Sequence, residues 1–199
     1  MIQRYITNPL LINGHKFDLR TYVLITSYEP LKIYVFQEGL ARFASEVYTT
    51  KIDKNNKYMH LTNYAINKNN ENFVYNENSE QDDVGFKWSL GAFCAHLEKA
   101  GIDMDLLWSR IYDLIIKTIL SGEHHVINAM KKMNVGRSNC FQLLGFDVLV
   151  DSDLKPWVLE VNLSPSLVTD SPLDHSIKAT LLSDTMNIVG VKRINRRVD

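Results

Sequence analysis

Two short apolar runs separated by a polar turn constrain the fold of this chain more than any other stretch. The runs are Phe146 to Val150 and Trp157 to Val161, and the Asp-Ser-Asp and Lys-Pro between them are typical of a tight turn. We therefore predict a β-hairpin. If its turn is centred midway between the runs, Asp147 lies directly opposite Glu160 on the neighbouring strand.

Three side chains of this hairpin carry oxygen atoms that could bind a metal ion. Glu160 and Asn162 are two residues apart and so point to one face, and Asp147 joins them from the other strand. Carboxylate and amide oxygens suit Mg²⁺ rather than zinc or copper, and protein-bound Mg²⁺ usually completes its shell with water and phosphate. A nucleotide is therefore expected. The alternative is an ordinary solvent-exposed face, because strand alternation produces such pairs in many hairpins.

Composition limits the class of protein. With 199 residues, of which 45% are hydrophobic, the chain can bury a substantial core in one large domain or two small ones. Its net charge of −1 gives no basic field for nucleic acid, and no apolar run is long enough to span a membrane. Cys94 and Cys140 lack metal-binding spacing and are expected to be reduced core residues. These features predict a cytoplasmic monomer without nucleic-acid or membrane partners.

A strand is expected over Lys16 to Thr26, where β-branched and aromatic residues dominate. Lys16, Asp18 and Arg20 are spaced by two and share one face, while the apolar residues between them take the other. Two interpretations remain open. The charged face could be a solvated sheet edge, or it could line a cleft in which the Lys and Arg meet phosphate groups.

Two further strands, Leu31 to Gln37 and Gly39 to Ser45, are expected to continue an antiparallel meander. Arg42 stands among apolar neighbours, so it is either a surface residue with a buried stem or an anion-binding group. The stretch from Met59 to Asn67 is too rich in Thr and Asn for a helix interior and is expected to be a structured loop. Its polar residues 60–63 are either ordinary turn residues or ligand-binding groups.

The remaining elements follow from periodicity and capping signals. Ser171 followed by Pro opens a helix that Gly190 ends, and Asp103 caps another. The buried face of the first of these helices is expected to contain Ile177, Leu181, Leu182 and Met186. The other expected elements are a strand-like piece over Gln3–Thr7, a surface loop over 67–83, and helices over 86–100, from about 104 to 118 and over 123–134.

Several motifs in fixed order resemble one family, the tubulin tyrosine ligase-like proteins, which have an ATP-grasp fold. The motifs are Gln3-Arg-Tyr-Ile, Lys16-Phe-Asp-Leu-Arg, Leu40-Ala-Arg-Phe-Ala, His60-Leu-Thr-Asn-Tyr, Gly145-Phe-Asp and Lys155-Pro-Trp-Val-Leu-Glu-Val-Asn-Leu-Ser-Pro-Ser. The resemblance implies an α+β fold, the carboxyl-terminal ATP-grasp lobe with a mostly antiparallel sheet flanked by helices. It covers residues 1–191 as a partial domain lacking the amino-terminal lobe, with 192–199 as a basic tail.

The resemblance also implies roles for individual residues. Mg²⁺ would be held by Asp147, Glu160 and Asn162. ATP would be contacted by Gln3, Arg4, Tyr5 and Ile6 in a hinge strand against the adenine, and by Lys16, Phe17, Asp18, Thr62 and Asn63. The incoming amino acid would be held by Arg42, Tyr64, Ala65, Lys87 and Lys178. The catalytic groups would be Arg20 near the γ-phosphate, Arg42 and Glu160.

Within the family the chain looks most similar to tubulin polyglutamylases. Such an enzyme uses ATP and Mg²⁺ to add free L-glutamate to glutamate side chains of tubulin or microtubules, through an acyl phosphate. This implies a cytoskeletal location, in a cilium or basal body among others. A non-catalytic tubulin- or nucleotide-binding module and a ligase for glycine or tyrosine are the alternatives. Acidic tubulin tails would be attracted by local basic patches, namely Lys51, Lys54, Lys57, Lys192, Arg193, Arg196 and Arg197. The isolated chain is expected to be weakly active or inactive.

Overall fold

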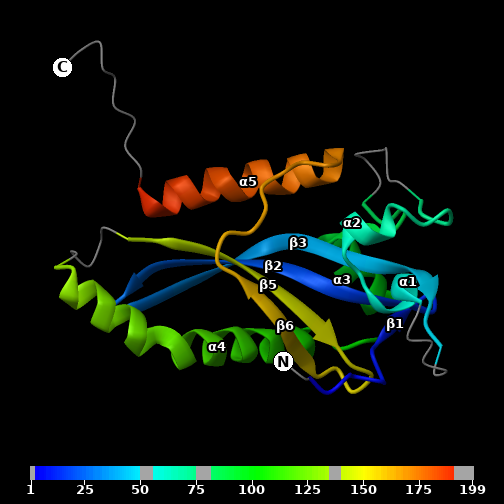
Figure 1. Ribbon diagram of the computed structural model, residues 1–199, viewed down its shortest axis with the longest axis horizontal. Helices are drawn as coiled ribbons and strands as arrows, with labels where there is room; N and C mark the ends of the chain where they lie inside the picture. The colour runs from blue at the N-terminus through cyan, green and yellow to red at the C-terminus, as the bar shows by residue number, and fades with distance from the viewer. Residues whose placement is uncertain (1–2, 50–55, 75–81, 135–139, 191–199) are drawn as a thin grey trace, which may run out of the picture.

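A six-stranded sheet forms the middle of the molecule (Figure 1). The computed structural model describes residues 3–49, 56–74, 82–134 and 140–190. All pairs of neighbouring strands are antiparallel, in the order β4-β3-β2-β5-β6, and β1 also pairs with β2. The strands are β1 Leu11–Ile12, β2 His15–Tyr28, β3 Leu31–Val47, β4 Lys87–Ser89, β5 Gln142–Val150 and β6 Pro156–Asn162.

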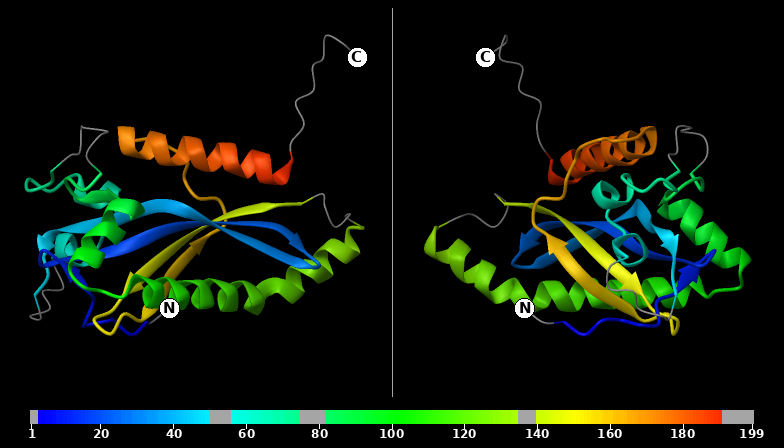
Figure 2. Two further views of the ribbon diagram at one scale, coloured as in Figure 1. Left: turned by 180° about the vertical axis from the view of Figure 1, so that it is seen from behind. Right: turned by 45° about the vertical axis from the view of Figure 1, so that its right-hand side comes forward.

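Helices flank this sheet on both faces (Figure 2). Helices α3 and α4 pack on one face through a large apolar cluster, and α5 packs on the other through a smaller cluster around Tyr22 and Leu40. The helices are α1 Lys57–His60, α2 Tyr64–Asn67, α3 Leu90–Lys99, α4 Met104–Lys132 and α5 Pro172–Val189. The α+β class with a mostly antiparallel sheet flanked by helices, expected from the sequence, is confirmed.

Strand β2 lies at the centre of the sheet and divides its two sides. Phe17 and Leu19 are fully buried in the cluster beneath α3 and α4. Lys16 and Asp18 point to the opposite face, and they too are buried. The interpretation of this charged face as a solvated sheet edge is therefore wrong, because β3 and β5 border β2 on its two sides.

Strand β3 is one continuous strand, so the prediction of two separate strands broken near Gly39 is wrong. Gly39 is needed inside the strand because a Cβ there would lie only 2.3 Å from the backbone oxygen of Arg20. The pairing of β2 with β3 shifts register between Thr21 and Val23, next to this close approach. The glycine thus permits an irregular pairing of two long strands rather than marking a turn.

Several helix limits differ from the expectation. Residues 87–89 pair with β3 as a short strand, so α3 begins later than predicted, with Ser89 as its N-cap. The two helices predicted over 104–134 are one continuous helix, α4, in which Gly122 is accommodated. The expected structured loop contains two single-turn helices, α1 and α2, each capped by an Asn side chain.

The amino-terminal segment and several side chains also depart from the predictions. Residues 3–6 adopt no regular structure. Backbone contacts with the β5–β6 hairpin begin later, where Ser152 N–H donates to Asn8 O and Leu10 N–H donates to Val150 O. On α5, Met186 is 43% exposed and so does not belong to the buried face, which instead includes Lys178 and Thr185. Cys140 is exposed, because it precedes β5 rather than lying inside it. Residues 75–81 of the predicted surface loop lie outside the described residues.

The capping predictions are confirmed. The Ser171 side chain accepts a hydrogen bond from the backbone N–H of Asp174, Pro172 is the first residue of α5, and Gly190 ends the helix with a φ of 76°. The Asp103 side chain accepts a bond from Leu106 N at the start of α4. Among the described residues, none of the helices has a stretch long and apolar enough to cross a membrane.

The close approach at Gly39 gives a stability prediction. Gly39→Ala should lower the free energy of unfolding by about 1–3 kcal/mol, because the new methyl group must displace the backbone of β2. Gly122→Ala in α4 is the matched control: its Cβ meets nothing within 4 Å, so it should raise stability by about 0.5–1 kcal/mol. Urea unfolding followed by circular dichroism measures both. Equal stability of the two variants would contradict the assignment of a steric role to Gly39.

Candidate functional site

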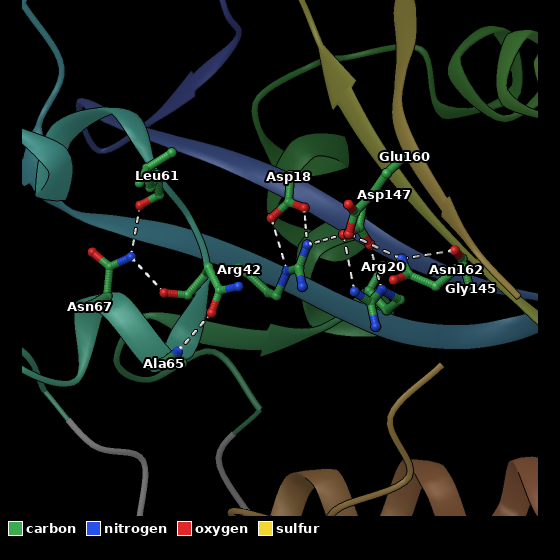
Figure 3. A network of polar contacts seen from close by, with 11 residues as sticks. Asp18, Arg20, Arg42, Leu61, Ala65, Asn67, Gly145, Asp147, Glu160 and Asn162 are labelled. Atoms are coloured by element: carbon green, nitrogen blue, oxygen red, sulfur yellow. Dashed lines mark hydrogen bonds and ion pairs between the residues drawn. The ribbon is translucent and has the colours of Figure 1, made fainter. Parts of the chain in front are cut away.

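The hairpin of β5 and β6 forms as predicted. Asp147 is paired with Glu160 and Gly145 with Asn162 in the antiparallel register. The Asn162 side-chain Nδ2 donates to Glu160 Oε1 at 3.2 Å and to Gly145 O at 3.3 Å (Figure 3). Glu160 is exposed and Asn162 is half-buried, so these two side chains of β6 are accessible, whereas Asp147 on β5 is buried.

Strand pairing brings two arginines to this hairpin. β2 lies between β3 and β5, with Arg20 opposite Asp147 and Asp18 opposite Arg42. Arg20 binds both oxygens of Asp147, through Nε to Oδ1 and through Nη2 to Oδ2 at 3.0 Å. Arg42 Nη2 lies 2.8 Å from Asp147 Oδ2, and its Nε donates to Asp18 Oδ1 at 3.0 Å. The result is a continuous chain of two guanidinium and two carboxylate groups (Figure 3).

Burial strengthens this ion-pair chain. The side chain of Arg42 is 14% exposed and that of Asp18 is 1% exposed. Burial alone would lower the pKa of Arg42, but the charges of Asp18 and Asp147 outweigh it and raise the pKa. Burial would likewise raise the pKa of Asp147, yet hydrogen bonds and charge from Arg20 and Arg42 hold it below its ordinary value. Arg42 is therefore a buried, fully charged group, and the surface interpretation of this residue is wrong.

The residues predicted to bind Mg²⁺ fit that ion by donor type. Glu160 and Asn162 carry oxygen atoms of the hard type that Mg²⁺ prefers, although it is the Asn162 amide nitrogen that contacts Glu160 Oε1. Both oxygens of Asp147, by contrast, already accept bonds from arginines. Among the described residues no three His, Cys, Asp or Glu side chains form a metal-binding group, and this set contains only two such side chains.

A second cluster surrounds Lys16 on the same strand as Asp18. Lys16 Nζ donates to the backbone oxygen of His60 at 2.9 Å and lies 4.9 Å from the centre of the Tyr5 ring. The Tyr5 hydroxyl in turn bonds His60 Nδ1 at 2.7 Å. Burial lowers the pKa of Lys16, and the neighbouring charge of Asp18 opposes that shift. The structure thus joins three segments that the sequence treated separately: residues 3–6, β2 and the end of α1.

The loop over residues 60–63 is held by Asn67, a residue that the sequence did not single out. The Asn67 amide donates to Leu61 O at 2.7 Å (Figure 3) and to Asn63 O at 3.0 Å. Its Oδ1 accepts from the N–H and the hydroxyl of Ser45 on β3. It is fully buried. An Asn inside a polar stretch carries no signal of burial, so only the fold identifies this anchor.

The third cluster lies beneath α5. Lys87 on β4 is the pairing neighbour of Arg42, and its Nζ lies 4.2 Å from the centre of the Tyr64 ring. The same ammonium binds Asp174 Oδ2 at 2.7 Å, and Lys178 Nζ lies 3.4 Å from Asp174 Oδ1. Three basic residues predicted to hold an amino acid or phosphate, Arg42, Lys87 and Lys178, are therefore neighbours. Asp174, which joins the two lysines, was missed.

The other predicted residues lie at different depths. Gln3, Arg4, Tyr5 and Ile6 line a cavity of about 500 Å³ against residues 157–159 of β6. Asn63 caps α2, since its Oδ1 accepts from Ala65 N at 2.8 Å, and Thr62 is half-buried beside it. The side chain of Phe17 lies in the core on the face of β2 opposite Lys16, so it does not reach these clusters.

Comparison with known proteins gives consistent relatives. The model of the tubulin-tyrosine ligase family matches residues 1–197. The human protein named tubulin polyglutamylase TTLL5 is 51% identical over 191 residues, which are 96% of this chain and 15% of that protein. Tubulin polyglutamylase ttll-5 of Caenorhabditis elegans is 48% identical over 200 residues, 100% of this chain and 27% of that protein.

A third relative, tubulin monoglutamylase TTLL4 of Mus musculus, is 48% identical over 191 residues, which are 96% of this chain and 16% of the relative. The chain thus spans between about a seventh and a quarter of the length of these relatives. The match of the family model to nearly the whole sequence shows that this chain belongs to the tubulin-tyrosine ligase family.

Proposed function

We propose that this chain supplies the nucleotide- and amino-acid-binding face of an ATP-dependent ligase that adds free L-glutamate to glutamate side chains of tubulin. The sheet would be the carboxyl-terminal lobe of an ATP-grasp fold. The names of the relatives, tubulin polyglutamylases and a monoglutamylase, support this substrate class. Such an enzyme would work with the cytoskeleton, including the microtubules of cilia and basal bodies.

One observation carries the proposal: four buried or half-buried basic side chains converge on a single face of the sheet. They come from β2, β3, β4 and α5 and comprise Arg20, Arg42, Lys87 and Lys178. Buried basic groups are costly unless they meet negative charge, and these four basic groups share three buried carboxylates, Asp18, Asp147 and Asp174. A phosphate or a carboxylate ligand would supply the missing negative charge.

The proposed reaction has two steps. An oxygen of the tubulin glutamate carboxylate attacks the γ-phosphorus of ATP, which forms an acyl phosphate and releases ADP. The amine of free glutamate then attacks the acyl carbon and loses a proton, and phosphate leaves as the isopeptide bond forms. Phosphoryl transfer requires positioning and charge neutralisation rather than a nucleophilic side chain. The rigid guanidinium groups of Arg20 and Arg42 suit this role, because they bind phosphate or carboxylate through two parallel bonds.

Mg²⁺ would be held by Glu160 and Asn162, with Asp147 as the third ligand. When bound, the ion neutralises charge on the phosphate oxygens. Arg20 and Arg42 place positive charge at Asp147, so a lone dication is disfavoured there. An anionic nucleotide would share these arginines and restore the balance. The cavity between residues 3–8 and β6, beside the hairpin, would receive the adenine.

A non-catalytic binding module remains the second candidate function. The specific observation in its favour is that the oxygens of Asp147 are bound by Arg20 and Arg42. A protein that stayed in this arrangement with nucleotide bound would bind the phosphates without assembling a three-residue Mg²⁺ site. Ligation of glycine or tyrosine is a variant of the first function, because the cluster at Lys87 and Lys178 recognises a carboxylate common to all amino acids.

Loss of the Glu160 carboxylate should abolish ligation. In the protein at its full natural length, Glu160→Gln should reduce ATP-dependent incorporation of glutamate into tubulin by about 100-fold or more, because several kcal/mol of charge stabilisation are lost. Mass spectrometry of tubulin tails, with glutamate, glycine and tyrosine offered separately, gives the measurement. Glu98→Gln, an exposed carboxylate on α3, is the matched control and should retain activity.

The two candidate functions differ in the outcome of that experiment. Incorporation of glutamate by the wild type, lost in Glu160→Gln, supports the ligase. Binding of ATP and tubulin without incorporation of any of the three amino acids would instead identify a binding module. Incorporation of glycine or tyrosine but not glutamate would change the substrate and leave the reaction class intact.

Metal binding should depend on nucleotide. Mn²⁺ can replace Mg²⁺ as a paramagnetic probe, and we expect its affinity to rise at least about tenfold, roughly 1.4 kcal/mol, when a non-hydrolysable ATP analogue is present. The physical reason is the positive charge of Arg20 and Arg42 beside Asp147. Electron paramagnetic resonance of free Mn²⁺ measures this. A titration of the nucleotide analogue alone gives the Mn²⁺ that the nucleotide itself binds, and this amount is subtracted. If the protein then binds Mn²⁺ equally tightly with and without the analogue, the expectation is contradicted.

A further inference from the structure

We propose that Asp174 is a positioning residue that sets Lys87 and Lys178 for the carboxylate of the free amino acid. This inference rests on the proposed ligase function and deepens it at one subsite. It concerns a carboxylate that lies in none of the sequence motifs quoted above and that touches no other acidic side chain of the site. Its role would be to act through the two lysines rather than on substrate directly.

The geometry places Asp174 between two segments that are distant in sequence. Asp174 stands in the first turn of α5 and is 1% exposed. Its Oδ2 binds Lys87 Nζ, from β4, at 2.7 Å, while its Oδ1 lies 3.4 Å from Lys178 Nζ, one turn further along α5. One carboxylate therefore fixes two ammonium groups from opposite walls of the same cluster.

The charges of this cluster leave room for one anion. Two ammonium groups share a single carboxylate, so the group carries one excess positive charge. Lys178 also donates to the backbone oxygen of Val168, and the Lys87 ammonium lies over the Tyr64 ring. Each of these contacts limits the direction in which the remaining N–H groups can point. A ligand carboxylate satisfies both the excess charge and those donors.

The carboxylate also limits the directions that the two lysine side chains can take. Lys87 is largely buried and Lys178 is 6% exposed, and each ammonium group is held by an oxygen of Asp174. Without those contacts the two ammonium groups would no longer be held in place for one ligand carboxylate. Removal of the Asp174 charge should therefore weaken the binding of the amino acid specifically. ATP contacts near Lys16 and the hairpin should be unaffected, because those residues belong to separate clusters.

The competing explanation is purely structural. Asp174 lies close to the N-cap residue Ser171, whose hydroxyl contacts the Asp174 carboxylate at 3.0 Å and accepts from its backbone N–H at 3.2 Å. Loss of Asp174 could thus act only by loosening the start of α5. Ser171→Ala separates the two roles, since it removes the cap and leaves the carboxylate with both lysines.

The test uses the protein at its full natural length, with Asp174→Asn and Ser171→Ala compared. Titration calorimetry with L-glutamate, in the presence of a non-hydrolysable ATP analogue, gives the affinity, and steady-state ligation gives KM for glutamate and for ATP. We expect Asp174→Asn to weaken glutamate binding at least tenfold and to change KM for ATP less than twofold. Ser171→Ala should lower the thermal midpoint and leave glutamate binding unchanged.

Three results would overturn the inference: unchanged glutamate affinity in Asp174→Asn, an equal loss of affinity in Ser171→Ala, or no glutamate binding by the wild type. If Asp174→Asn does not fold, Asp174→Glu replaces it, and a loss of about threefold in glutamate affinity is expected because the charge moves by one methylene. If the wild type binds glutamate but ligates none, the proposed ligase function is refuted. The role of Asp174 in glutamate binding is then decided by the calorimetric affinities of Asp174→Asn and Ser171→Ala.

Discussion

The interaction on which the site depends is the buried chain of ion pairs linking β3, β2 and β5. Arg42 sits between Asp18 and Asp147, and Arg20 completes the chain from the central strand. Removing one partner of such a buried pair typically costs about 3–5 kcal/mol, because the other charge remains desolvated. The groups that we propose to bind an anionic ligand are therefore also needed for the fold. A ligand that binds the arginines must replace interactions with Asp18 or Asp147, which ties ligand binding to the arrangement of three strands.

The part of the site that could be predicted from sequence is local. The register of Asp147 against Glu160 follows from the length of one hairpin, and the shared face of Lys16, Asp18 and Arg20 follows from alternation along one strand. Family motifs supplied expected roles for these residues, which no contact in the structure tests directly. The helix caps at Ser171 and Gly190 were equally local, and they too are confirmed.

What could not be predicted depends on contacts between distant segments. Arg20 and Asp147 are 127 positions apart, and Lys87 and Asp174 are 87 apart, so no spacing rule connects them. Gly39 was misinterpreted as a break because its reason, the approach of the β2 backbone, exists only in the folded sheet. Asn67 illustrates the same limit: it anchors the loop over residues 61–63 to β3 from inside a stretch whose composition suggests only a turn.

Two kinds of contact fix the position of α5 on this face of the sheet. The helix is attached by apolar contacts of Leu173, Ile177 and Leu181 with Tyr22 and Leu40, and by the ion pair of Asp174 with Lys87. The apolar contacts have no direction, so they fix the distance of the helix from the sheet more firmly than its rotation. The ion pair is directional, and it fixes the rotation at the end of the helix that carries Lys178. Lys87 is also the pairing neighbour of Arg42, so the ion-pair chain and the contact that orients α5 lie on adjacent residues of β3 and β4. The arrangement of α5 over this face therefore depends on the pairing of the short strand β4 with β3 as well as on the apolar contacts of the helix itself.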